Sequence, residues 1–205
     1  MARELPFIAI LRGVRPDEVL AHARVLAGAG FQAIEVPTNS PSWQDSVSQL
    51  AAAYVEDQEV AVGAGTVLTV ADVDALAATG ARLMVAPNTD AAVVRRAKAK
   101  GLLAFVGAMT PTEALAAVAA GADALKIFPA SVVGVDFARI LKAVLPREVP
   151  LYAVGGVAPA NLAAYAGKGW AGFGLGGELY RSGQSVADTE AKAAAFRRAW
   201  EALRS

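Results

Sequence analysis

Cysteine is missing from this 205-residue sequence, which excludes disulfide bonds and thiolate chemistry and is compatible with a reducing cytosol. Histidine occurs once, as His22, and no cluster of acidic residues accompanies it. His22 falls in the middle of an expected helix among polar neighbours, so we expect it on a solvated face. With so few suitable ligands, the sequence predicts neither a metal site nor a bound cofactor.

An excess of charge is also missing, since 19 basic and 19 acidic side chains balance. Neither sign forms a long run, so we expect no electrostatic surface for nucleic acid or anionic lipid. Long hydrophobic runs are absent too. The apolar stretch near the N-terminus is soon interrupted by Arg12 and Asp17 and is too brief for a signal peptide or a membrane span. These features predict a cytoplasmic protein without nucleic-acid or membrane partners.

Brief apolar runs alternate with alanine-rich amphipathic stretches along the chain. Several runs are apolar at consecutive positions, as in parallel strands that are covered on both faces. Proline and acidic residues mark expected helix starts, as at Pro16, Pro41 and Pro111, and glycine marks expected ends, as at Gly30 and Gly121. The expected strands are residues 7–11, 33–37, 60–65, 83–86, 102–106, 124–128, 151–154 and, more weakly, 172–175.

Eight such units predict one α/β domain over residues 1–205, folded as a single (β/α)8 TIM barrel. Alternation of elements alone also fits an open doubly wound sheet. Two details favour the barrel: no Gly-x-Gly-x-x-Gly follows the first strand, and small polar or glycine-rich motifs follow several strands. In a barrel those loops meet at one end, where active sites lie.

Two charged side chains interrupt strands that are otherwise apolar. Lys126 lies in such a strand, where burial lowers the pKa of a lysine toward the neutral amine that attacks a ketone. A head group that reaches water at the rim, or a buried salt bridge, fits this position equally well. Glu35 suits a general acid or base, or a structural ion pair with Lys126 or Arg12. Lys126 and Glu35 are each a single charged residue in an apolar strand, and finding this twice, on separate strands, favours catalytic roles for both.

Candidate anion-binding groups follow the first, seventh and eighth strands. Arg12 can hold a carboxylate or phosphate by two bonds, although a solvated rim charge is as good an interpretation. Gly155-Gly156 and Gly176-Gly177 occupy the two loops with which barrels often bind phosphate through backbone N–H groups. Thr66 and Pro87 can contact a substrate as well, but in the absence of further support ordinary loop or cap roles are the better interpretation of both.

Together these motifs resemble the family of bacterial 2-keto-3-deoxy-6-phosphogluconate and 6-phosphogalactonate aldolases over nearly the whole length, and the galactonate members more closely. The resemblance implies a metal-independent class I aldolase in which Lys126 forms the Schiff base and Glu35 shuttles a proton. It places Arg12, Thr66 and Pro87 around the pyruvate part of the substrate. The segments that carry it are IAILRG (8–13), EVPTNSP (35–41), GAGTVL (63–68), LKIFP (125–129) and AVGGV (153–157).

The resemblance also implies the partners of the protein. The substrate would be a phosphorylated sugar acid, with Gly155, Gly156, Gly176 and Gly177 on its phosphate, and the products would be pyruvate and glyceraldehyde 3-phosphate. Members of the family are typically homotrimers. This chain departs from the usual pattern at Gly177-Glu178, where relatives often have serine, and Glu178 would repel a phosphate unless it points away.

Two positions point to the galactonate branch. Asn39 stands where gluconate members have an arginine, which Arg12 can replace, and Val154 stands where they tend to have a threonine. Loss of that hydroxyl should change discrimination at C4 of the substrate. The alternatives are the same reaction on the C4 epimer, a phosphosugar isomerase or epimerase on the same barrel, and a barrel that only binds a sugar phosphate.

Overall fold

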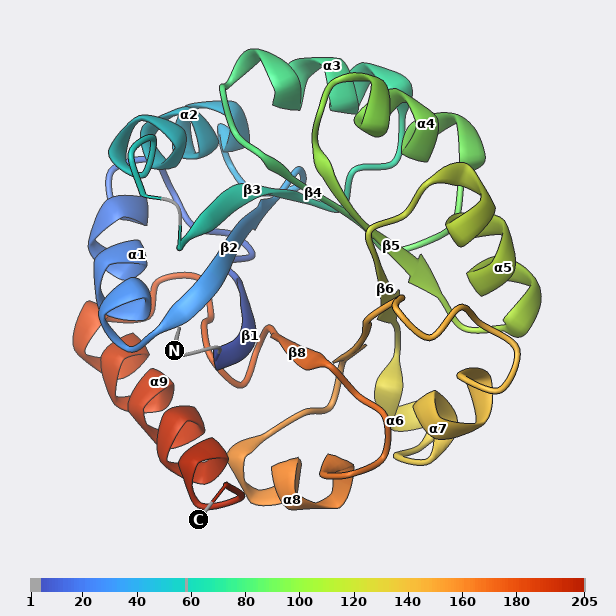
Figure 1. Cartoon of the computed structure of the whole chain (residues 1–205). Coiled ribbons are helices and arrows are strands. Elements are labelled where there is room, and N and C mark those ends of the chain that lie inside the picture. Colours follow the sequence, from blue (N-terminus) through green and yellow to red (C-terminus); the bar gives the residue numbers. More distant parts are fainter. Residues whose placement is uncertain (1–4, 58, 205) are drawn as a thin grey trace.

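The computed structural model describes residues 5–57 and 59–204. Eight parallel strands pair in sequence order and close into a barrel, with helices around its outside (Figure 1). The strands are β1 (Leu5–Ile10), β2 (Phe31–Pro37), β3 (Ala61–Gly65), β4 (Leu83–Ala86), β5 (Leu103–Ala108), β6 (Ala124–Ile127), β7 (Leu151–Val154) and β8 (Gly172–Leu175). The closed order confirms the predicted (β/α)8 barrel and excludes the doubly wound sheet.

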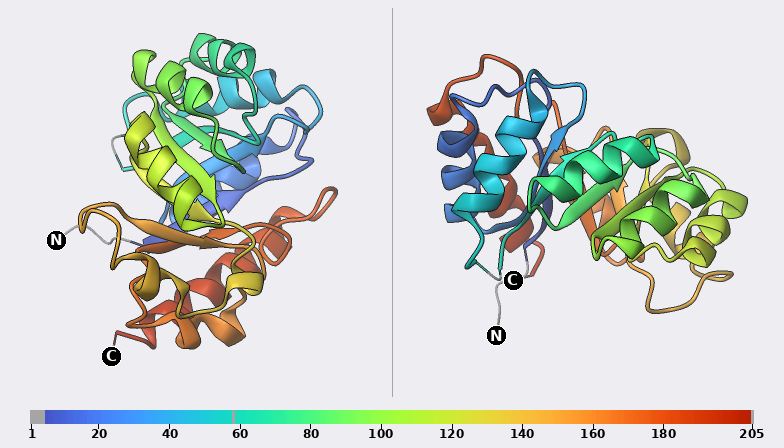
Figure 2. Two further views of the ribbon diagram at one scale, coloured as in Figure 1. Left: turned by 90° about the vertical axis from the view of Figure 1, so that its right-hand side faces the viewer. Right: turned by 90° about the horizontal axis from the view of Figure 1, so that it is seen from above.

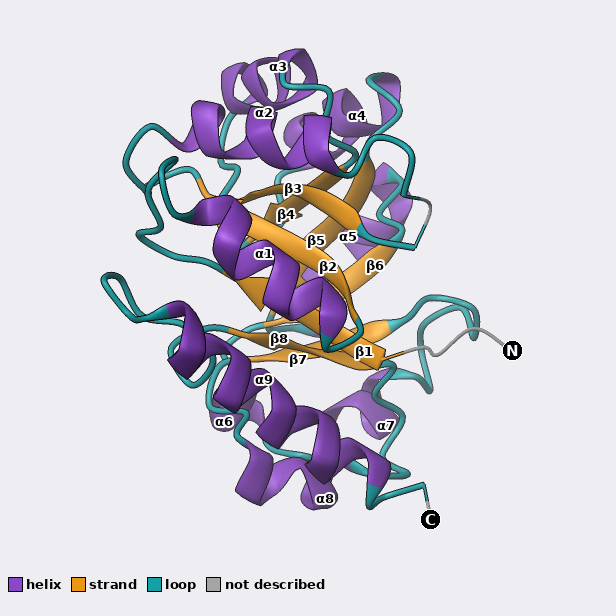
Figure 3. Cartoon of the chain, turned by 90° about the vertical axis from the view of Figure 1, so that its left-hand side faces the viewer, coloured by secondary structure: helices purple, strands orange, loops and turns teal. Residues whose placement is uncertain are grey.

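The helices form the outer layer, which Figure 3 shows in purple around the orange strands. They are α1 (Val19–Gly28), α2 (Trp43–Ala53), α3 (Val70–Ala78), α4 (Ala91–Ala99), α5 (Pro111–Ala120), α6 (Ala130–Val133), α7 (Phe137–Leu141), α8 (Leu162–Tyr165) after the short 3-10 turn η1 (Pro159–Asn161), and α9 (Val186–Glu201). Two short helices follow β6, because Gly134 ends α6 with a φ of 83°. None of the helices in the described part of the chain has the length and apolarity needed to span a bilayer.

Local signals explain where the helices begin and end. The side chain of Thr110 accepts a hydrogen bond from the backbone N–H of Glu113, whose carboxylate accepts one from the N–H of Thr110 in return. Pro111 follows as the first residue of α5, and Gly121 ends the helix with a φ of 104°. Both ends of α5 therefore lie where the sequence predicts them.

Two hydrophobic clusters hold the barrel. The larger one fills the layer between strands and helices, and the smaller one fills the barrel interior with Ile8, Ala33, Leu83 and Val85. Along β6 the side chains of Leu125 and Ile127 belong to the outer cluster, as the alternation of a strand requires. The intervening side chain must therefore face the interior, and this residue is Lys126.

The prediction for His22 was wrong. The side chain is only 1% exposed, its Nδ1 lies 2.9 Å from Oγ1 of Thr189 on α9, and its ring contacts that of Tyr180 edge-on. Burial lowers the pKa of His22. The spacing carries the correct signal, because residues 19, 22, 23 and 26 share one face of α1, and that face packs in the core.

Candidate active site

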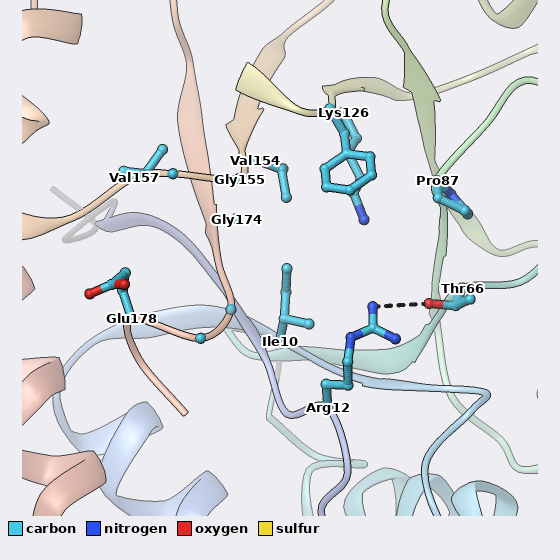
Figure 4. Close-up of a pocket in the computed structure, with 14 residues that line it drawn as sticks. Ile10, Arg12, Thr66, Pro87, Lys126, Val154, Gly155, Val157, Gly174 and Glu178 are labelled. Carbon is cyan, nitrogen blue, oxygen red and sulfur yellow. Dashed lines mark hydrogen bonds between the residues drawn. The ribbon is translucent and has the colours of Figure 1, made fainter. Parts of the chain in front are cut away.

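A pocket of about 320 Å³ opens at the end of the barrel where the strands end. Figure 2 shows the loop between β8 and α9 projecting from this same end. Nine of the ten residues that the sequence proposes for the site line the pocket: Arg12, Thr66, Pro87, Lys126, Val154, Gly155, Gly156, Gly176 and Gly177 (Figure 4). The tenth, Glu35, lies deeper and lines an adjoining cavity of about 10 Å³ together with Lys126. The fold thus brings all ten to one end of the barrel from strands and loops that are distant in sequence.

Lys126 extends from β6 into the pocket, where Figure 4 shows its side chain pointing toward the loops of β1 and β3. Its side chain is 6% exposed, and Nζ lies 5.5 Å from the centre of the Phe128 ring. Burial lowers the pKa of Lys126, and the positive charge of Arg12 lowers it further, whereas Glu35 acts in the opposite direction. The net effect of these surroundings is a shift of Lys126 toward the neutral amine.

Glu35 lies on β2 and is 1% exposed. Burial raises its pKa from 4.5 to about 7, although the positive charges of Lys126 and Arg12 oppose the shift. Its Oε2 has no hydrogen-bond partner among the described residues. A carboxylate in this position loses hydration without a compensating bond, so the protonated form is stabilised. A carboxyl group that titrates near neutrality can both take up and release a proton.

Gly65 makes room for this carboxyl group. A Cβ atom at Gly65 would lie 1.7 Å from Oε2 and 2.2 Å from Cδ of Glu35, so the carboxyl group rests directly against the Cα of Gly65. The sequence singled out the neighbouring Thr66 as a candidate site residue and did not single out Gly65. The role of Gly65 depends on how β2 and β3 pair, and no local pattern reveals it.

Arg12 is fixed at the pocket rim by two side chains. Its Nη1 donates to Oδ1 of Asn39 at 2.6 Å, and its Nη2 donates to Oγ1 of Thr66 at 3.3 Å (Figure 4 shows the second bond). The guanidinium is thereby oriented beside Thr66 and retains donors for an anion. The sequence identified Arg12 and Thr66, and it identified Asn39 only as a departure from the gluconate pattern.

Two glycine turns, Gly155-Gly156 and Gly176-Gly177, also line the pocket. Gly155 and Gly156 have φ values of 94° and 80°, a region that other residues rarely adopt. A Cβ at Gly176 or Gly177 would meet nothing within 4 Å, so the space beside each Cα is open. Glu178 also lines the pocket, on the side away from Thr66 in Figure 4.

Val154 covers part of the pocket wall. It is 5% exposed, and a Cβ at Gly174 on the neighbouring strand would lie 2.6 Å from its Cγ2. Gly174 therefore leaves the space that the valine side chain occupies. The wall at this point is apolar and offers no hydroxyl to a ligand.

Residues 1–191 match the family "KDPG and KHG aldolase". The chain belongs to the KDPG and KHG aldolase family. It is thus an aldolase, a carbon–carbon lyase. Among the described residues, no three His, Cys, Asp or Glu side chains are grouped to hold a metal ion.

Individual relatives agree with the family. The chain is 50% identical over 197 residues to the 2-dehydro-3-deoxy-6-phosphogalactonate aldolase of Escherichia coli strain K12. The match covers 96% of this chain and 95% of that protein. A solved structure described as native KDPGal is 48% identical, with a TM-score of 0.94 and coverage of 100% and 98%. A cube-shaped cage designed by fusing symmetric oligomeric domains is 49% identical, with a TM-score of 0.94, and the match covers 98% of this chain and 74% of that one.

Proposed function

We propose that this aldolase cleaves 2-dehydro-3-deoxy-6-phosphogalactonate to pyruvate and D-glyceraldehyde 3-phosphate through a Schiff base on Lys126. The observation that carries the proposal is the buried Lys126 in the pocket, with its pKa lowered by desolvation, near Glu35, whose pKa is about 7. A neutral amine attacks a ketone, and a carboxyl group that titrates near neutrality exchanges the protons that the reaction moves.

The reaction begins when the neutral amine of Lys126 attacks the C2 ketone. The protonated carboxyl group of Glu35 gives its proton to the oxygen of C2, which leaves as water, and a protonated imine and the carboxylate of Glu35 remain. The imine accepts the electron pair of the C3–C4 bond as that bond breaks. Glu35 takes the proton from the C4 hydroxyl, so that C4 leaves as an aldehyde and an enamine stays on the lysine. Glu35 then returns a proton to C3. Water hydrolyses the protonated imine to free pyruvate and the amine, and the proton that this step releases goes back to Glu35.

The two ends of the substrate bind on opposite sides of Lys126. Arg12 and Thr66 hold the carboxylate of the pyruvate part, beside Pro87, because their donors converge there. Backbone N–H groups of Gly155-Gly156 and Gly176-Gly177 bind the phosphate. Glycine allows the close approach that this binding requires.

Borohydride reduction with pyruvate tests the Schiff base. Mass spectrometry should find one three-carbon adduct, on Lys126, while the other lysines of the same sample stay unmodified as an internal control. Lys126→Ala should abolish both the adduct and pyruvate release. A Lys126→Ala protein that cleaves substrate near the wild-type rate contradicts the mechanism, and so does the absence of any adduct from wild type that releases pyruvate.

The preference for the galactonate epimer is supported by Val154 and by the identity to the Escherichia coli enzyme. An apolar wall cannot hydrogen-bond a substrate hydroxyl, so a threonine at this position should select differently at C4. A coupled assay of pyruvate release compares the two C4 epimers. We expect faster cleavage of the galactonate substrate by wild type and a shift toward the gluconate substrate in Val154→Thr. Equal rates for wild type would contradict the epimer preference but not the aldolase chemistry.

We further propose that residues 1–205 form one catalytic domain that works as a cytoplasmic homotrimer. Four large apolar side chains on and around α6 and α7 are exposed, namely Phe128, Val132, Ile140 and Val144, and contact with a second copy would cover them. The cage that this chain matches is built from symmetric oligomeric domains. Light scattering should give three times 21.0 kDa for wild type and a smaller mass for Ile140→Glu. A wild-type mass of one chain contradicts this assembly.

A further inference from the structure

Thr66 has an unfavourable backbone conformation. Its φ is 58°, in the left-handed region, and among the described non-glycine residues only Ser42 shares a positive φ. Threonine is branched at Cβ, so this region is sterically costly for it. A residue remains in such a conformation only where its surroundings hold it there. Contacts from neighbouring residues must therefore hold Thr66.

Thr38, at the end of β2, makes two contacts with the Gly65-Thr66 turn. Its Oγ1 donates a hydrogen bond of 2.7 Å to the backbone carbonyl of Thr66, and its backbone N–H donates one of 2.8 Å to the carbonyl of Gly65. On the other side, the N–H of Val67 donates to the carbonyl of Val85 at 3.2 Å. Hydrogen bonds thus attach the turn to both neighbouring strands. Among the described residues, Thr38 is the only one whose side chain donates a hydrogen bond to the carbonyl of Thr66.

The conformation of the Thr66 backbone decides where its hydroxyl lies. With φ at 58°, Oγ1 accepts from Nη2 of Arg12 at 3.3 Å, on the pocket wall. A return of Thr66 to an ordinary negative φ would rotate its side chain and its carbonyl together. Thr38 itself does not line the pocket. Its hydroxyl therefore acts on a ligand only through Thr66.

We infer that Thr38 is a positioning residue, whose hydroxyl keeps Thr66 in the left-handed conformation in which the Thr66 hydroxyl and Arg12 receive the substrate carboxylate. This inference rests on the proposed function, since it assigns the carboxylate of the pyruvate part to Arg12 and Thr66. Loss of the Thr38 hydroxyl should therefore weaken the binding of pyruvate more than the chemistry at Lys126.

The test is borohydride trapping of pyruvate over a range of pyruvate concentrations, with wild type, Thr38→Val, Thr38→Ala and Thr38→Ser. Valine keeps the shape of threonine and removes the donor. We expect the half-saturating pyruvate concentration to rise about five- to ten-fold in Thr38→Val and Thr38→Ala, as the loss of one hydrogen bond predicts. The trapping rate at saturation should stay within about twofold, and Thr38→Ser should restore wild-type behaviour.

Thr79 offers a matched control. Its Oγ1 also donates to a backbone carbonyl, that of Leu76 at 2.6 Å, but it follows α3 and lies at the opposite end of the barrel from the pocket. Thr79→Val should leave the half-saturating concentration unchanged. An equal rise in Thr79→Val and Thr38→Val would show a general loss of stability and overturn the inference.

Thr66→Gly separates positioning from any independent effect of Thr38. Glycine adopts a positive φ freely, so in this background the Thr38 hydroxyl has no strain to oppose. Adding Thr38→Val to Thr66→Gly should change the half-saturating concentration by less than about twofold. A full five- to ten-fold change in that background, or no change from Thr38→Val alone, overturns the inference. Failure of wild type to trap pyruvate at all would instead contradict the proposed function.

Discussion

Replacement of Gly65 by alanine should disable the site without any change to a polar group. The added Cβ would lie 1.7 Å from Oε2 of Glu35, against the 3.4 Å at which ordinary contact begins, so the carboxyl group must move by about 1.7 Å. Gly65 is not among the glycines with a positive φ, so alanine suits its backbone. The whole effect therefore falls on the position of Glu35.

The displacement sets the expected loss of activity. A misplacement of about 1 Å in a catalytic group costs about 100-fold in rate, so Gly65→Ala should lower kcat for pyruvate release at least that much. Trapping of pyruvate on Lys126 should slow as well, because Glu35 serves imine formation in the proposed mechanism. Both rates are measured on the same preparations, together with Tm.

Two further variants test whether displacement of Glu35 causes the loss of activity. Gly28→Ala in α1 introduces a Cβ that meets nothing within 4 Å, so its activity and Tm should stay at or slightly above wild type. In a Glu35→Ala background the added methyl group has room, so Gly65→Ala should there leave Tm nearly unchanged. A Gly65→Ala enzyme with kcat within about threefold of wild type would refute the reasoning.

Two other buried groups give stability predictions. Burial raises the pKa of Glu35 from 4.5 to about 7, so the folded protein binds more protons than the unfolded chain between these pH values. This carboxyl group should therefore lower the free energy of unfolding by about 3 kcal/mol as the pH rises from 4.5 to 7. Urea unfolding should show this fall for wild type but not for Glu35→Gln; equal curves contradict the prediction. Replacement of the buried His22 by alanine removes its contacts with Thr189 and Tyr180, and it should lower the free energy of unfolding by about 2–4 kcal/mol. Arg24→Ala, at an exposed position of the same helix, should lower it by less than about 0.5 kcal/mol. A smaller loss than in Arg24→Ala would contradict the assigned burial of His22.

The barrel could be predicted from the sequence because each strand and helix carries its own local signals. All eight expected strands occur, and β4, β7 and β8 have the expected bounds. The ends of other strands depend on their partners. β5 continues to Ala108, beyond the expected 106, because Gly107 and Ala108 pair with Lys126 and Ile127 of β6. The second short helix after β6 was not expected.

The residues of the candidate site also differ in whether the sequence alone reveals them. Lys126 and Glu35 could be found because a charge in an apolar strand stands out in the sequence itself. Gly65 and Thr38 could not, since their importance lies in what faces them across the β2–β3 pair. A glycine that leaves space for a carboxyl group has the same local sequence as one that only turns the chain.

Burial acts on the protonation of two charged groups of the site. For both Lys126 and Glu35 the largest influence on the pKa is burial, which disfavours the charged form of each. Burial therefore favours the neutral pair over the ion pair, whereas the mutual attraction of the two charges favours the ion pair. In the proposed mechanism this neutral pair is the reactive one, because a free amine attacks the ketone while a protonated carboxyl group can give its proton to the oxygen that leaves as water. Opening the pocket to solvent should stabilise the ion pair and slow imine formation, even with both residues in place.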